Sequence, residues 1–152
     1  MNAMKPTAAP RISAETIHAS TVALDGRAVL ITGPSGSGKS DLTLRLLDRG
    51  FTMVSDDRTI VKRDGNRLIA SAPSTIAGKL EVRGIGIIEM ERAENVPIAL
   101  AVELTSEIQR LPDDSRQRPI LGISLPLVTI DAMTASAPSK VAIALDRMGL
   151  KF

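Results

Sequence analysis

Residues 33–40 have the composition and spacing of a phosphate-binding loop. They fit the pattern G-x-x-x-x-G-K-[ST] and read Gly33-Pro34-Ser35-Gly36-Ser37-Gly38-Lys39-Ser40. The glycines of such a loop let the backbone wrap around an anion, and successive N–H groups point inward. We expect Lys39 to reach the β- and γ-phosphates and the Ser40 hydroxyl to bind Mg²⁺. This chemistry predicts that the chain binds a nucleoside triphosphate.

The segments on either side of this loop predict a strand before it and a helix after it. An apolar run, 28–31, precedes the loop, and residues 41–49 place Leu42 and Leu46 on one helical stripe. A helix N-terminus adds partial positive charge to a phosphate site. The alternative is a flexible Gly/Ser turn that happens to contain a lysine. The order of strand, loop and helix disfavours this alternative.

Two adjacent aspartates, Asp56 and Asp57, follow the short apolar strand predicted at 51–55. Ligands of open α/β sheets bind at the C-terminal ends of strands. A carboxylate there would hold Mg²⁺ or accept a proton from an attacking hydroxyl. Neighbouring strand residues point in different directions, so one aspartate would serve the reaction and the other the structure. The alternative is a solvated Asp-Asp turn.

Three further side chains are candidates whose roles the residues alone leave open. His18 lies in a run, 16–24, that alternates as one strand, and it is either close to the phosphates or an ordinary surface histidine. Glu81 begins a β-rich run, 80–90, and is either a second metal contact or a surface carboxylate. Arg110 would offset charge on a transferring phosphoryl group, or it is a solvated loop arginine.

The other patterns predict an α/β fold with a strand-rich sheet and few helices. Hairpins are expected across Asp25-Gly26 and across Asp64-Gly65-Asn66. Gly84 and Gly86, within the β-rich run, predict a bulge or a backbone held close to a ligand. Further elements are expected as a strand at 97–104, one or two short strands within 120–130 broken at Pro126, and a helix at 140–148 entered through Pro138.

Composition excludes several classes of protein. The 152 residues are 43% hydrophobic and 24% charged, with a net charge of +2 and only two aromatic residues, both Phe. Single-stranded nucleic-acid binding uses aromatic stacking, so it is not expected, nor is a general polyanion binder. The absence of cysteine and the single histidine exclude disulfides, thiolate metal sites and a His-rich zinc site.

The same sequence predicts one domain outside the membrane. No apolar stretch approaches the roughly 20 residues that span a bilayer, and no secretory h-region is present, so we expect a cytoplasmic protein. Residues 1–12 are Ala/Pro-rich and are expected to be a disordered lead-in. Residues 13–152 are expected to form a single P-loop kinase catalytic domain.

Four segments of the chain together resemble the catalytic domain of HPr kinase/phosphorylase. They are 34–39, 49–51, 54–57 and 81–88. The last reads Glu-Val-Arg-Gly-Ile-Gly-Ile-Ile and is the most specific, because ordinary P-loop proteins lack it at this distance. The resemblance runs from about residue 13 to 110 and continues weakly to 148. It implies the HPr kinase/PEP carboxykinase-like fold.

The resemblance implies a protein kinase that uses ATP and Mg²⁺. The family phosphorylates a serine of HPr, the small carrier protein of the sugar phosphotransferase system. Lys39 and the surrounding loop would hold the β- and γ-phosphates, and Ser40 would bind the metal. Asp57 matches the family's proton acceptor for the substrate serine. Asp56 precedes it in the family's Asp-Asp pair as a supporting residue.

Three other positions match family site residues. His18 matches the active-site histidine, and Glu81 matches the second metal contact. Arg110 matches the arginine of an Arg-Leu-Gly motif, although Pro112 replaces the glycine here. The family forms homo-hexamers, so we expect self-association.

The sequence departs from the family pattern in two places. Common members carry a separate N-terminal domain, and this sequence begins almost directly at the catalytic part, as expected of a truncated form. The family also has a Pro-Val-x-Pro-Gly-Arg-Asn-like loop associated with phosphorolysis of phosphoserine-HPr. Residues 129–136 occupy that place without arginine or glycine. We therefore predict a kinase with weak or no phosphorylase activity.

Two other classes of function stay open on the sequence. One is a P-loop kinase for a small molecule, with a lid that would use Arg110, Arg116 or Arg118. This class does not explain the glycine-containing stretch. The other is a non-catalytic nucleotide-binding regulator, which the candidate acidic residues and His18 disfavour.

Overall fold

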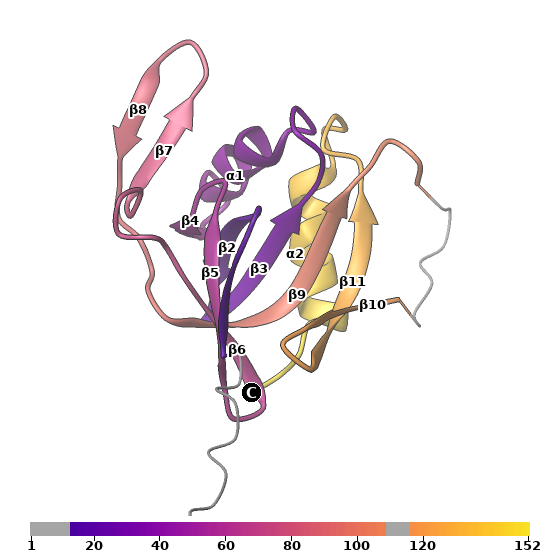
Figure 1. Ribbon diagram of the computed structural model, residues 1–152. Coiled ribbons are helices and arrows are strands. Elements are labelled where there is room, and N and C mark those ends of the chain that lie inside the picture. Colours follow the sequence, from indigo (N-terminus) through magenta and orange to yellow (C-terminus); the bar gives the residue numbers. More distant parts are fainter. Residues whose placement is uncertain (1–12, 109–115) are drawn as a thin grey trace, which may run out of the picture.

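The computed structural model describes residues 13–108 and 116–152 (Figure 1). Strands far outnumber helices in this part of the chain, which confirms the predicted strand-rich α/β fold. In chain order the elements are β1 (Ala14–Ile17), β2 (Ser20–Leu24), β3 (Arg27–Thr32), α1 (Lys39–Leu47), β4 (Thr52–Ser55), β5 (Thr59–Asp64), β6 (Arg67–Ser71), β7 (Lys79–Val82), β8 (Gly86–Glu89), β9 (Val96–Leu104), β10 (Gln117–Ile120), β11 (Ile123–Ile130) and α2 (Ala137–Met148).

The long strand β9 organises the main sheet, whose order is β1-β5-β6-β9-β3-β2-β4. One edge of β9 pairs in parallel with β3. The other edge pairs first with β6, antiparallel, and then with β11, in parallel. The strands β3, β9 and β11 therefore run in one direction, and their C-terminal ends meet at one edge of the sheet (Figure 1).

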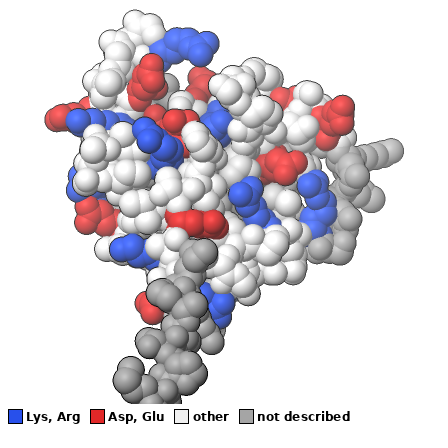
Figure 2. Space-filling view, in the orientation of Figure 1, with Lys and Arg blue, Asp and Glu red and all other residues white. Residues whose placement is uncertain are grey.

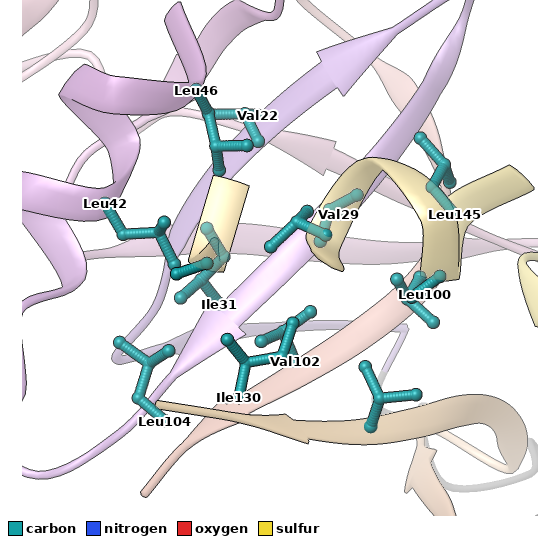
Figure 3. Close-up of a cluster of buried hydrophobic side chains, with 14 of the residues drawn as sticks. Val22, Val29, Ile31, Leu42, Leu46, Leu100, Val102, Leu104, Ile130 and Leu145 are labelled. Carbon is teal, nitrogen blue, oxygen red and sulfur yellow. The ribbon is translucent and has the colours of Figure 1, made fainter. Parts of the chain in front are cut away.

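Residues of β3 alternate between two cores, as expected of a strand buried on both faces. Val29 and Ile31 join the core beneath the two helices, whereas Ala28 and Leu30 join the core on the opposite face. In Figure 3, Leu42 of α1 lies beside Ile31 in the helical core. The second core takes its other side chains mainly from strands and none from a helix, among them Ile17, Val54, Val61, Leu68, Ala70, Ile98, Ile120 and Leu125.

Both predicted helices are present, with shifted bounds: α1 begins and ends two residues before the predicted 41–49, and α2 begins three residues before the predicted 140–148. Gly38 precedes α1 with φ 95°, a conformation that glycine adopts without steric cost, and Gly50 follows the helix with φ 93°. Leu42 and Leu46 are fully buried on its inner stripe. Pro138 stands in the first turn of α2, where a proline nitrogen needs no hydrogen-bond partner.

The prediction of one continuous strand over 16–24 is wrong. The chain bends at His18 and Ala19, so that β1 pairs with β5 while β2 pairs with β3 and β4. The two strands lie in different parts of the sheet, and the bend carries the chain from one to the other. His18 therefore lies in the connection and shares no strand face with Thr16 and Ser20.

The predicted break at Pro126 is also displaced. Pro126 lies within β11, and the chain turns instead at Leu121 and Gly122, where φ is 50° and 82°. Pairing of β11 with β9 starts at Leu127, so the missing N–H of Pro126 costs no bond to β9. The proline therefore precedes the doubly paired part of the strand.

The glycines of the 80–90 run form a hairpin turn and not a bulge. Val82 pairs with Gly86 across residues 83–85, and β7 and β8 form a separate two-stranded sheet that projects from the molecule (Figure 1). Gly84 and Gly86 have φ of 85° and 121°, and no atom lies within 4 Å of a Cβ placed on either. Their positive φ serves the turn, and no other part of the described protein approaches them.

The surface carries charges of both signs. Figure 2 shows acidic and basic side chains interspersed on the face in view, in keeping with the net charge of +2. Within the described residues, neither helix is long and apolar enough to cross a membrane.

The inner face of α2 provides a test of this packing. Leu145 is 1% exposed, whereas Ile143 on the same helix is 59% exposed. We expect Leu145→Ala to lower the free energy of unfolding by about 2–5 kcal/mol, because it leaves a cavity in the helical core. We expect Ile143→Ala to change it by less than about 0.5 kcal/mol. Urea denaturation measures both, and equal losses would contradict the assigned inner face.

Candidate functional site

A cavity of about 830 Å³ opens at the edge where the parallel strands end. Its lining comes from the loop after β3, the first turns of α1, the bend before β2, the turn after β4, the β7–β8 hairpin and the turn after β11. The lining residues are His18, Gly33, Ser35, Gly36, Gly38, Lys39, Ser40, Asp41, Leu44, Arg45, Asp57, Glu81, Val82, Arg83, Ala132 and Met133.

The phosphate-binding loop curls tightly around the Lys39 ammonium group. Lys39 Nζ donates to the carbonyls of Gly33 and Pro34, at 2.8 and 3.3 Å. A Cβ on Gly33 would lie 2.5 Å from Ser37 Oγ and 3.0 Å from Leu104 Cβ, so the curl leaves little room for a side chain there. Within the described residues, Ser37 Oγ is buried without a hydrogen-bond partner. The loop therefore keeps one hydroxyl and one cation available for an anionic ligand.

Asp56 is a buried carboxylate that joins three segments of the chain. Only 8% of the residue is exposed. Its Oδ1 accepts hydrogen bonds from the hydroxyls of Ser40, at 2.8 Å, and Ser20, at 3.1 Å. Its Oδ2 lies 3.5 Å from the backbone N–H of Glu81. The carboxylate thereby connects α1, β2 and β7, and these donors replace the water that burial removes.

Asp57 is exposed where its neighbour is buried. It occupies the centre of a γ-turn, in which Arg58 N donates to Asp56 O at 2.7 Å and Asp57 has φ 66°. Asp57 N also donates to Ser20 Oγ, at 3.0 Å. The turn ends β4 abruptly and places Asp57 on the cavity wall. The two aspartates have different surroundings, as predicted, but a γ-turn and not the expected continuation of the strand separates them.

Most of the other predicted site residues that are described line the same cavity, although Pro34 and Ser37 do not. His18 and Glu81 both line it, from the bend before β2 and from β7. Lys39 and Ser40 line it from the first turn of α1. Arg110 lies outside the described residues. The structure therefore brings His18, Lys39, Ser40, Asp57 and Glu81 together from four segments.

Several neighbours of the site were not singled out from the sequence. Ser20 donates to Asp56, but its place depends on the strand break that the alternating pattern concealed. Arg83 lines the cavity and stands within the Glu-x-Arg-Gly stretch, which was a signal for it. Arg45 and Met133 also line the cavity, and no motif marked either one.

The donor set at this site suits a hard cation. Ser40, Asp56 and Glu81 offer only oxygen ligands, which Mg²⁺ prefers. Among the described residues, no three His, Cys, Asp or Glu side chains form a group that could hold a metal by themselves. Protein sites for Mg²⁺ often supply one or two ligands and leave the rest to phosphates and water, so the residues present fit this ion.

Comparison with known proteins identifies the family. The model of the HPr serine kinase C-terminal domain matches residues 11–147. The chain is 36% identical over 143 residues to HPr kinase/phosphorylase of Alkaliphilus metalliredigens, covering 86% of this chain and 45% of that protein. It is 35% identical over 127 residues to the protein of the same name from Chlorobaculum tepidum, covering 74% of this chain and 37% of that protein.

A solved structure agrees with this assignment. The structure of the Hpr(Ser) kinase/phosphatase from Coxiella burnetii matches with a TM-score of 0.75 and 31% identity, covering 87% of this chain and 94% of that one. The chain thus belongs to the HPr serine kinase C-terminal domain family, as its motifs predicted. It spans less than half the length of the two curated relatives named above.

The unlike surroundings of the two aspartates predict unlike effects of their substitution on folding. We expect Asp56→Ala to lower the free energy of unfolding by about 1–3 kcal/mol, because its buried donors lose their acceptor. We expect Asp57→Asn to change it by less than about 0.5 kcal/mol, because the residue is exposed and asparagine tolerates positive φ. Urea denaturation of both variants checks this, and equal destabilisation would contradict the assignment of Asp56 as the structural carboxylate.

Proposed function

We propose that this member of the HPr serine kinase C-terminal domain family is an ATP- and Mg²⁺-dependent kinase that phosphorylates a serine of an HPr-type phosphocarrier protein. One observation carries the proposal: Lys39 of the phosphate-binding loop and the exposed Asp57 line the same cavity. A kinase site needs a cradle for the donor phosphates and a proton acceptor beside it.

The donor side is the loop of residues 33–40. Its N–H groups and the Lys39 ammonium group would hold the β- and γ-phosphates, which carry the charge that this loop attracts. On binding, the phosphates would replace the carbonyls of Gly33 and Pro34 as partners of Lys39 Nζ. The Ser37 hydroxyl supports this assignment, because it is a buried donor without a protein partner in the described residues.

The metal side is formed by Ser40 and Glu81. The hydroxyl of Ser40 and the carboxylate of Glu81 would hold Mg²⁺, and both residues line the cavity. Asp56 would support them, since it bonds to the Ser40 hydroxyl and lies next to the Glu81 backbone. When bound, Mg²⁺ supplies charge neutralisation on the phosphate oxygens.

The acceptor side is Asp57. The hydroxyl oxygen of the substrate serine attacks the γ-phosphorus as the bond between that phosphorus and the β–γ bridging oxygen breaks, and ADP leaves. Asp57 takes the proton of the serine hydroxyl. His18 lines the same cavity, and we assign it an active-site role. We assign Arg110 to offset charge on the transferring phosphoryl group. The catalytic set is then His18, Lys39, Asp57 and Arg110.

The family resemblance also supports a homo-hexamer and a cytoplasmic location. The β7–β8 hairpin exposes Ile85 and Ile87, at 75% and 69%, which favours contact with another protein surface. Self-association would cover such side chains.

The donor and acceptor roles are tested by separate variants. We expect Lys39→Ala to lower the transfer rate by at least about 100-fold, because the charge that stabilises the transferring phosphates is lost. We expect Asp57→Asn to lower the rate by about 100-fold or more and to leave ATP affinity within about threefold, because only proton transfer is removed. Labelled ATP with HPr-type proteins measures transfer, and calorimetry measures binding.

Lys140→Ala and Asp146→Asn are matched controls, because both residues are exposed on α2 and do not line the cavity. Near-normal transfer by Asp57→Asn would contradict its role as proton acceptor. Transfer to small molecules and not to HPr-type proteins would favour the small-molecule kinase. Tight ATP binding with no transfer to any acceptor would favour the non-catalytic regulator.

Phosphorolysis of phosphoserine-HPr is expected to be weak. In that reaction an oxygen of inorganic phosphate attacks the phosphoserine phosphorus, releasing serine and pyrophosphate. The turn after β11 brings Ala132 and Met133 to the cavity where the family loop carries arginine. Incoming phosphate therefore lacks one cation. Pyrophosphate release from phosphoserine-HPr and phosphate measures the reaction, and a rate comparable to the kinase rate would contradict this expectation.

A further inference from the structure

The turn that follows β11 forms one wall of the cavity. It covers residues 131–136 and leads into α2, on the far side of the phosphate-binding loop from the β7–β8 hairpin (Figure 1). Ala132 is buried, whereas Met133 is 76% exposed and still lines the cavity. The Met133 side chain is therefore accessible to a ligand bound at this wall of the cavity.

Hydrogen bonds within the turn fix its local shape. Met133 N donates to Asp131 Oδ1 at 2.9 Å, and Thr134 Oγ1 donates to Asp131 O at 2.9 Å. Thr134 N donates to the same carbonyl, at 3.3 Å. These bonds all join residues of the turn to each other. They leave open what sets its position relative to the phosphate-binding loop.

Arg45 connects the turn to α1. Its Nη1 donates to Thr134 O at 3.2 Å, and its Nη2 donates to Ala132 O. Its Nε lies 3.1 Å from Asp41 Oδ2 one helical turn earlier, which places a carboxylate beside the guanidinium group. A planar guanidinium can bridge two carbonyls at fixed spacing, which the single ammonium group of lysine does less well.

The position of the turn determines the space at the start of α1. A Cβ placed on Gly38 would lie 3.2 Å from Ala132 Cβ and 3.8 Å from Met133 Cε. Gly38 precedes α1 with φ 95° and directly precedes Lys39. Movement of the turn would therefore change the wall that lies against the nucleotide-binding loop.

We propose that Arg45 is a positioning residue for the donor nucleotide: it holds the 131–136 turn against the start of α1, so that Ala132 and Met133 form the donor-side wall of the cavity. The inference rests on the proposed function for the identity of the donor. Both Nη atoms of Arg45 donate to carbonyls of the turn, so we assign Arg45 to act through the turn and not on the reacting atoms. Its loss should accordingly weaken nucleotide binding more than it slows the chemical step.

Two variants and one control test this role. We expect Arg45→Ala to raise the KM for ATP about tenfold, the equivalent of one lost charge-assisted hydrogen bond, and to change kcat by less than about threefold. Hydrogen exchange of the amides of residues 131–137 should accelerate in the same variant. Arg45→Lys retains the charge but lacks the planar guanidinium group that bonds to two carbonyls. It should give a KM for ATP and exchange rates between those of the wild type and Arg45→Ala. Arg147→Ala, at an exposed arginine of α2, should change neither quantity.

The exchange measurement separates this inference from the proposed function. If the wild type binds ATP but transfers nothing to HPr-type proteins, the proposed function fails, and the dissociation constant of a non-hydrolysable ATP analogue replaces KM. Unchanged exchange in Arg45→Ala would overturn the role of Arg45 in holding the turn. Faster exchange with unchanged nucleotide affinity would overturn its role in the donor wall, as would no ATP binding by the wild type. If Arg45→Ala does not fold, Arg45→Lys decides by the same criteria.

Discussion

The hydrogen bonds of the buried Asp56 carboxylate are the interaction on which the candidate site depends. A carboxylate that is 8% exposed must receive donors from the protein, because water no longer supplies them. Its donors come from Ser40, Ser20 and the backbone of Glu81, which belong to three separate elements. Displacing any of these elements would leave part of the charge without a partner. The electrostatic requirement of one side chain therefore couples the start of α1 to β2 and to the β7–β8 hairpin.

The direction of β2 explains how these residues reach one edge of the sheet. The strands β3 and β4 end at this edge, and β2 runs antiparallel between them, so it begins where they end. Ser20 pairs with Ile31 near the end of β3, and Thr21 pairs with Ser55 at the end of β4. The bend that contains His18 precedes β2 and must lie at the same edge. Because β2 runs antiparallel to β3 and β4, it adds residues from its N-terminal side to the edge where both of those strands have their C-terminal ends.

Local patterns predicted much of the fold, and non-local pairing accounts for the rest. The turns at Asp25-Gly26 and Gly65-Asn66 and the apolar stripe of α1 follow from neighbouring residues, and all three were predicted. The break at His18 was missed because the alternation on its two sides is the same, although β1 and β2 pair with different strands. Lys39, Asp57 and Glu81 could be named as candidate site residues because chemistry restricts their types, and all three line the cavity. The role of Ser20 follows only from the strand register.

The contacts of Arg45 illustrate a limit that applies beyond this chain. Its acceptors at Ala132 and Thr134 are backbone carbonyls, which every residue type presents alike. A contact of this kind does not restrict the residue types of the acceptors, so no sequence motif links residue 45 to residues 132–134. The salt bridge to Asp41 was visible in the sequence, but it indicated only a stable helix. Side chains that recognise ligands can be found through their chemistry, whereas side chains that position backbone can be found only through the geometry that the fold creates.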